Sequence, residues 1–152
     1  RPDSLTADSV YRVVSRFAPV ADSEAVAYSF WKVISPLPKP ESEYESIHLD
    51  PVDIQSIWQS GDYLNMVLQV MVKDKEHELS FIDNGITSNA NGTQTLHLTL
   101  YHHRKDDVEG FMQKYYLSVP LWHYQGKLNK GDTIVFELYT YKEGMTQRTF
   151  TY

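Results

Sequence analysis

Two stretches of alternating apolar and polar residues constrain the fold of this chain most strongly. In residues 95–101, Leu96, Leu98 and Leu100 share one face, and threonine, histidine and tyrosine occupy the other. In residues 115–121, apolar side chains again recur at every second position. A period of two is typical of a strand with one buried face. The polar run 102–110 between them predicts a hairpin loop, so we expect the two stretches to form an antiparallel pair in a β-sheet core.

Similar strands and turns are expected along the whole chain from residue 52. The runs that read as strands are residues 52–58, 63–72, 77–82, 95–101, 115–121, 133–141 and 146–152. This spacing predicts an all-β fold, an antiparallel β-sandwich of about seven strands. Trp58, at the end of the first run, is expected to fill the space between the sheets. Its expected companions are Leu64, Leu68, Leu98, Leu100, Leu117, Val119, Phe136 and Leu138.

The N-terminal third is less regular. Residues 9–17 and 24–34 are rich in β-branched and aromatic residues, which favours two further strands. Pro36, Pro38 and Pro40 then alternate through a stretch that suits a loop or polyproline II, with acidic residues following. Residues 35–46 are therefore the expected linker.

Composition excludes several classes of protein. The 152 residues suit one ordinary domain, and the net charge of −6 lacks the basic stripe of a nucleic-acid binder. The absence of cysteine excludes disulfides and thiolate sites. No apolar run is long enough for a transmembrane segment. The chain begins at Arg1 without a signal peptide, so we expect a processed or truncated product.

The densest cluster of reactive side chains runs from His102 to Asp107 and includes His103. Histidine and aspartate can bind zinc or act as acid and base. Adjacent histidines on a strand, however, point to opposite faces and do not converge easily on one ion. The segment is also placed where a solvated hairpin loop is expected, and polar loop composition needs no site to explain it. The solvated loop is the preferred interpretation.

A second candidate is the consecutive trio Trp122, His123 and Tyr124, which follows the end of a strand. Three large amphipathic rings can stack on a sugar or anchor a partner. The plainer alternative, which we favour, is that Trp122 closes the end of the core, because tryptophan is usually largely buried. His97, opposite the leucine face, is expected to form a cross-strand polar pair.

The order of these strands and turns resembles the C-terminal β-sandwich domain of the NigD-like proteins, exported lipoproteins of Bacteroidetes. The residues that carry the resemblance are Asp50-Pro51, Ile57-Trp58, Asn91-Gly92 and residues 60–65, 96–102, 116–121, 131–134 and 150–152. The resemblance implies a small OB-like barrel before the sandwich, and residues 9–34 look like its second half. It therefore implies a partial OB-like segment with the proline-rich linker at 1–46, and a sandwich domain at 47–152. It also implies export to the periplasm, outer membrane or cell surface, with a lipid anchor only in a longer precursor.

No catalytic motif stands out. The chain has neither a Gly-x-Ser-x-Gly elbow nor a phosphate-binding glycine pattern. Together with what the resemblance implies about location, this absence leads us to expect a non-enzymatic cell-envelope protein, a binding module for an envelope protein or glycan, without catalytic residues, metal or cofactor. Two alternatives stay open. One is a metal-assisted hydrolase that uses the loop from His102 to Asp107, and the other is a purely structural or assembly protein.

Overall fold

A computed structural model of the chain describes the backbone of residues 13–21 and 24–152, and the side chains from residue 33 onward. Within this part of the chain the regular structure is strands and two short 3₁₀ helices, which confirms the all-β prediction. The strands are β1 (Val13–Ala21), β2 (Glu24–Lys32), β3 (Lys39–Pro40), β4 (Asp53–Ser60), β5 (Tyr63–Val72), β6 (Glu78–Ser88), β7 (Gln94–His103), β8 (Phe111–Pro120), β9 (Thr133–Thr140) and β10 (Gly144–Thr151). The 3₁₀ helices are η1 (Glu41–Glu43) and η2 (Leu121–Tyr124).

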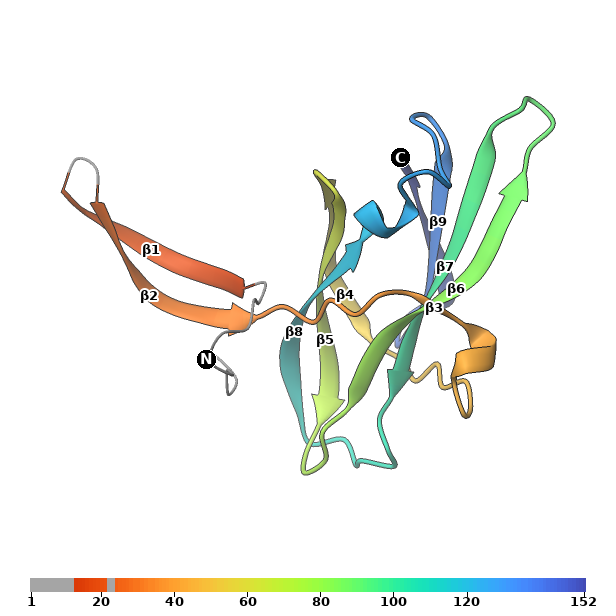
Figure 1. The fold of residues 1–152 in the computed structure, drawn as a ribbon. Coiled ribbons are helices and arrows are strands. Elements are labelled where there is room, and N and C mark those ends of the chain that lie inside the picture. Colours follow the sequence, from red (N-terminus) through yellow and green to blue (C-terminus); the bar gives the residue numbers. More distant parts are fainter. Residues whose placement is uncertain (1–12, 22–23) are drawn as a thin grey trace.

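Eight of these strands form a sandwich of two sheets (Figure 1). One sheet has five strands in the order β10-β9-β7-β6-β3, and the other has three in the order β4-β5-β8. Most neighbours are antiparallel, as predicted, but β7 pairs with β9 in parallel, and so does β3 with β6. The β1–β2 hairpin is a sheet of its own.

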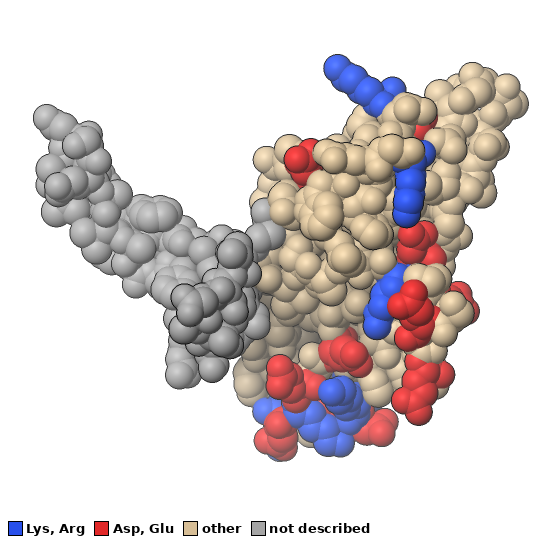
Figure 2. Space-filling view, in the orientation of Figure 1, with Lys and Arg blue, Asp and Glu red and all other residues tan. Residues whose placement is uncertain are grey.

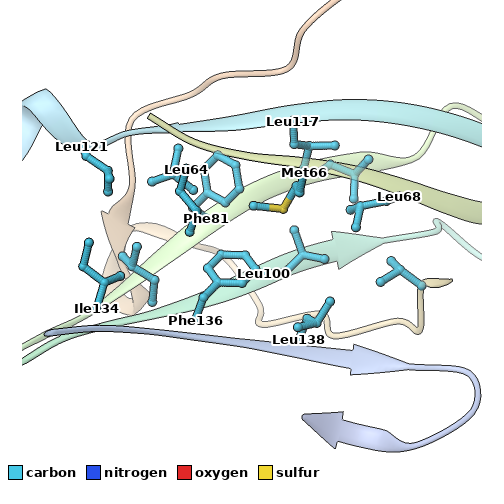
Figure 3. Packing of buried hydrophobic residues seen from close by; sticks show 14 of the residues in the cluster. Leu64, Met66, Leu68, Phe81, Leu100, Leu117, Leu121, Ile134, Phe136 and Leu138 are labelled. Carbon is cyan, nitrogen blue, oxygen red and sulfur yellow. The ribbon is translucent and has the colours of Figure 1, made fainter. Parts of the chain in front are cut away.

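The core lies between the two sheets, where their inward side chains meet (Figure 3). Alternation is regular on β5, where every second side chain is buried. Phe81 and Phe136, from neighbouring regions of the five-stranded sheet, meet edge to face with ring centroids 6.2 Å apart. The leucines, valine and phenylalanine expected as companions of Trp58 are all buried, which confirms that part of the predicted core.

The predicted pairing of residues 95–101 with 115–121 is wrong. The first stretch lies in β7, which pairs with β6 and β9, and the second lies in β8, which pairs with β5 in the opposite sheet. The segment between β7 and β8 therefore crosses from one sheet to the other and is no hairpin loop. Two strands with the same alternation can face one another across a core as well as pair edge to edge, so periodicity alone does not choose between these arrangements.

The prediction that Trp58 fills the space between the sheets is also wrong, because its side chain is 46% exposed. Val52 and Ile54 point inward, and continued alternation would bring Trp58 inward too. A bulge between Ile54 and Ser56 changes the parity, so that Ile57 takes the inward position. An extra residue in one strand moves every later side chain to the other face.

The residues expected to be a linker contribute to the sandwich. Lys39 and Pro40 form β3 beside β6, and η1 follows directly. Before them, Ile34 pairs with the edge of β8, where its N–H donates to the carbonyl of Tyr116 and its carbonyl accepts from Ser118. Residues 34–40 thus contact both sheets.

The chain reverses between β6 and β7 at residues 89–93, and residues 83–86 form a bulge inside β6. β1 and β2 correspond to the strands predicted at 9–17 and 24–34, although residues 9–12 lie outside the described part. In residues 13–21 and 24–152, no helix has the length and apolar character required to span a membrane.

Candidate functional site

The trio Trp122, His123 and Tyr124 forms η2, which leads from the three-stranded sheet towards β9. The rings follow one another edge to face, with centroids 6.3 Å and 5.2 Å apart. Trp122 is 44% exposed, whereas Tyr124 is 1% exposed and belongs to the core. The end of the core is therefore filled by Tyr124, where Trp122 was expected. Of the three rings, Trp122 is the one that presents a large surface to solvent.

The hydroxyl of Tyr124 is satisfied inside the protein. It donates a hydrogen bond to the carboxylate of Asp83, 2.8 Å away, and so ties η2 to the bulge in β6. Burial, followed by this bond and the nearby negative charge, raises the pKa of Tyr124 far above its ordinary value. A buried hydroxyl with a charged partner is a stability feature.

The stretch from His102 to Asp107 is not the solvated loop that was expected. His102 and Asp107 are 1% and 3% exposed, and His77 joins them from the start of β6. His77 Nε2 lies 2.9 Å from the Asp107 carboxylate, and His77 Nδ1 lies 2.9 Å from His102 Nε2. His102 Nδ1 is 3.0 Å from the carbonyl oxygen of Asp50. We call this hydrogen-bonded series the buried histidine chain.

The partners of the buried histidine chain determine which ring nitrogens donate hydrogen bonds. The Asp50 carbonyl only accepts, so His102 Nδ1 carries a proton, and the Asp107 carboxylate likewise accepts from His77 Nε2. The bond between the two rings needs a third proton, one more than two neutral imidazoles carry. Burial is the largest cause that lowers the pKa of His102. The contact between His77 and Asp107 is a salt bridge in the state in which His77 is protonated.

Asp107 is held as a carboxylate by its surroundings. Burial by itself raises the pKa of Asp107, but hydrogen bonds from the backbone N–H groups of Asp74 and Lys73 and from His77 outweigh it and lower the pKa well below its ordinary value. These bonds connect the β7–β8 crossing to the β5–β6 turn. They also stabilise the turn from Arg104 to Asp107, in which Lys105 and Asp106 both have positive φ angles.

The hydrogen bonds of the buried histidine chain suit a structural role better than a catalytic one. In a catalytic histidine–aspartate dyad, one imidazole nitrogen faces a nucleophile or substrate. Here both nitrogens of both rings form hydrogen bonds with other groups of the protein. Among the residues from 33 to 152, no group of three or more histidine or acidic side chains is arranged to hold a metal ion. His103, the neighbour of His102, points to the other face of β7, as expected for a strand.

On that other side lies a polar hollow of about 480 Å³, which we call the His48 pocket. It forms between the segment that carries β3 and η1 and the adjoining parts of β6 and β7. Its lining residues are Lys39, Glu43, Tyr44, Glu45, Ser46, His48, Glu78, Tyr101, His103 and Lys105. Figure 2 shows acidic and basic side chains mixed on the side of the sandwich that carries η1, whereas much of the face towards the viewer is uncharged.

Four aromatic rings form a continuous array in this pocket. Tyr44 stacks on Tyr101 with centroids 4.5 Å apart, and Tyr101 meets His48 edge to face at 6.1 Å. His48 in turn stacks on His103, with centroids 3.6 Å apart and planes within 3° of parallel. Lys39 places its ammonium 4.5 Å from the centre of the Tyr44 ring. Rings packed on one another in this way have little freedom to move, so the pocket wall is preorganised.

The backbone that carries His48 is fixed to the sandwich. His102 donates its N–H to the His48 carbonyl, and Asp50 donates its N–H to the His102 carbonyl. The Asp50 carboxylate also accepts from the N–H of Arg104. Tyr44 is fixed at its hydroxyl, which donates to the carbonyl of Phe81 at 2.7 Å. The buried histidine chain therefore supports the segment on which the pocket is built.

Sequence reasoning brought together few of these residues. It singled out His102 and Asp107 but not His77, it assigned Tyr44 to a linker, and it gave His48 no role. It predicted a cross-strand polar pair for His97 without naming the partner, which is Thr87 of the neighbouring strand, 2.9 Å from His97 Nε2. No local signal marks His77 or His48, because their partners lie far away in the sequence.

Comparison with known proteins agrees with the fold. Residues 35–152 match the NigD-like C-terminal beta sandwich domain. A solved structure of a NigD-like immunity protein from Bacteroides caccae is 30% identical, with a TM-score of 0.80 over 99% of this chain and 79% of that one. A protein of unknown function from Bacteroides vulgatus shares the fold at 17% identity, with a TM-score of 0.70 over 100% of this chain and 76% of that one. No curated protein matches the chain. With the sandwich topology in place and these matches covering most of its length, the chain belongs to the NigD-like family.

Proposed function

We propose that this protein is a non-enzymatic binding module of the bacterial cell envelope, exported from the cytoplasm, that recognises its partner through the His48 pocket. The observation that carries the proposal is the combination of a preorganised aromatic wall with charged side chains that line the same hollow. A pocket with a fixed wall and a few convergent polar groups is the usual form of a recognition site.

The relative from Bacteroides caccae supports a role in recognition. That protein is described as an immunity protein. Immunity achieved by capturing a partner requires a complementary surface and no reaction. The buried histidine chain agrees with this proposal, because its imidazoles are occupied within the protein and have no nitrogen left for substrate.

Affinity capture with matched variants tests the proposal. The intact chain and the Glu78→Gln variant are immobilised and exposed to the same detergent-solubilised envelope extract, with Glu76→Gln as the control. Both glutamates are exposed near the start of β6, but only Glu78 lines the His48 pocket. We expect a partner that is retained by the intact chain and by Glu76→Gln, and lost with Glu78→Gln.

Two results would contradict the proposal. Equal capture by all three proteins would remove the pocket from recognition. Elemental analysis that finds a stoichiometric metal, lost in His103→Ala, would instead favour the metal-assisted hydrolase. Fractionation of cells that express the natural protein tests the location separately, since a protein found only in the cytoplasm would refute export.

A further inference from the structure

Among residues 33–152, the charged groups that line the His48 pocket have no hydrogen-bond partner, although the Lys39 ammonium lies over the Tyr44 ring. Lys39 and Lys105 line it together with Glu43, Glu45 and Glu78. In residues 33–152, the ion pair between His77 and Asp107 is the sole salt bridge, so these lysines and glutamates do not pair with one another. Charges of opposite sign that share a hollow without pairing remain available to a ligand.

The balance of these charges limits the ligand. Three carboxylates and two ammonium groups place charges of both signs around the pocket, with a sum of only −1. An anionic ligand would approach three carboxylates, and a cationic one would approach two ammonium groups, at distances where like charges repel. A neutral ligand with many hydroxyls meets no such repulsion. Each hydroxyl donates to a carboxylate, which only accepts, and accepts from an ammonium, which only donates.

The aromatic array adds the second requirement. Tyr44, His48 and His103 are partly exposed and give the pocket some aromatic surface beside its charges, whereas Tyr101 is buried beneath them. A sugar ring has this dual character, because its C–H groups pack on an aromatic ring while its hydroxyls point outward to polar partners. A volume of about 480 Å³ lies within the range of small-ligand sites.

From these features we infer that the His48 pocket binds a neutral carbohydrate, with the aromatic array contacting the sugar ring and the glutamates and lysines contacting its hydroxyls. This inference rests on the proposed function, since it names the ligand class of the same pocket. His103 contributes ring surface and Glu78 contributes acceptor oxygens.

The test measures direct binding of defined sugars to the intact chain. A panel of neutral monosaccharides and disaccharides, including N-acetylated and unsubstituted hexoses, is screened by saturation-transfer NMR, and the positive sugars are titrated by calorimetry. We expect at least one sugar to bind. Glu78→Gln and His103→Ala should weaken that binding by about tenfold or more, because the first replaces a charged acceptor oxygen with an NH2 donor and the second removes a ring that contacts the sugar.

Two controls keep the result specific. Glu76→Gln changes a neighbouring glutamate outside the pocket, and His97→Ala removes a histidine of the same strand whose partner is Thr87. Both should bind the sugar as the unmodified chain does. Circular dichroism and urea titration of each variant verify that it is folded. If no sugar in the panel binds, or if both pocket variants bind as well as the controls, the inference is wrong.

Capture from an envelope extract treated with glycosidases distinguishes this inference from the proposed function. Treating the envelope extract with glycosidases should abolish capture if a carbohydrate is recognised. If capture survives that treatment, still depends on Glu78, and no free sugar binds, the partner is a protein. The carbohydrate inference then falls while the binding role stands. If capture never depends on Glu78, both are refuted.

Discussion

Removing the ring of Tyr124 is expected to destabilise the sandwich far more than removing the ring of Trp122, two positions earlier in η2. Tyr124 is 1% exposed within the core, whereas Trp122 is 44% exposed. Truncation of a buried aromatic side chain to alanine costs about 3–5 kcal/mol. The total free energy of unfolding of most domains is only about 5–15 kcal/mol. Trp122→Ala removes no core contact of this kind and should cost about 1 kcal/mol or less.

A third variant separates the ring of Tyr124 from its hydroxyl. Tyr124→Phe keeps the buried ring and deletes the donor to Asp83, which lies 2.8 Å away. Hydrogen bonds to charged groups contribute about 1.5–3 kcal/mol. Tyr124→Phe should therefore fall between the other two variants in its effect on the free energy of unfolding.

Urea titration followed by far-UV circular dichroism measures all three changes in the intact chain at neutral pH. The denaturant midpoint should fall in the order Trp122→Ala, Tyr124→Phe, Tyr124→Ala, with little change in the slope. If Trp122→Ala proves the most damaging, the roles assigned to the two rings are reversed. If Tyr124→Phe is neutral, the bond to Asp83 does not contribute as described.

Other predictions address the crossing, the bulge and a close backbone contact. Because the folded-state pKa of Asp107 is below its ordinary value of 3.8, its stabilisation is present at neutral pH and is lost as the pH falls through that folded value. Asp107→Asn should therefore flatten the acid limb of stability against pH in urea titrations. Asp106→Gly should raise the thermal midpoint slightly, because glycine adopts the positive φ of 58° without strain; a lower midpoint would argue against the turn. Gly110→Ala should lower the midpoint, because an added Cβ would lie 2.8 Å from the Val72 carbonyl, and a neutral result would contradict that contact. Trp58→Ala should cost clearly less than Tyr124→Ala in the same urea titration, and equal losses would place Trp58 back in the core.

The sequence predicts well what depends on alternation within one strand. The leucines of β5 and β7 and Phe136 of β9 are buried as expected. Burial alternates along β5 and β9. In β7 the leucines keep their spacing of two, although Thr99, Tyr101 and His102 are buried as well. Trp58 shows the limit of this reasoning. One bulged residue in β4 reverses the inward face, and nothing in the residue types near Ile54 announces the bulge.

Pairing and site assembly are less predictable because they depend on distant residues. β7 and β8 carry similar patterns, and their assignment to opposite sheets is secured by Asp107, which holds the crossing against Lys73 and Asp74. His48 reaches His103 only because its segment lies against the end of β7. Such contacts arise from tertiary structure and leave no periodic trace in the sequence.

The strand order also bears on how quickly this chain can fold. Short turns join β4 with β5, β6 with β7, and β9 with β10, but Tyr63 must find Pro120 and Leu96 must find Ile134 before either sheet is complete. Closing such a long loop costs conformational entropy before the stabilising contacts have formed. Folds rich in distant pairings therefore have a high free-energy barrier to folding. We expect these three hairpins to form early and the pairing of β7 with β9, the β7–β9 seam, to form late. In stopped-flow experiments, substitutions along that seam should therefore accelerate unfolding more than they slow folding.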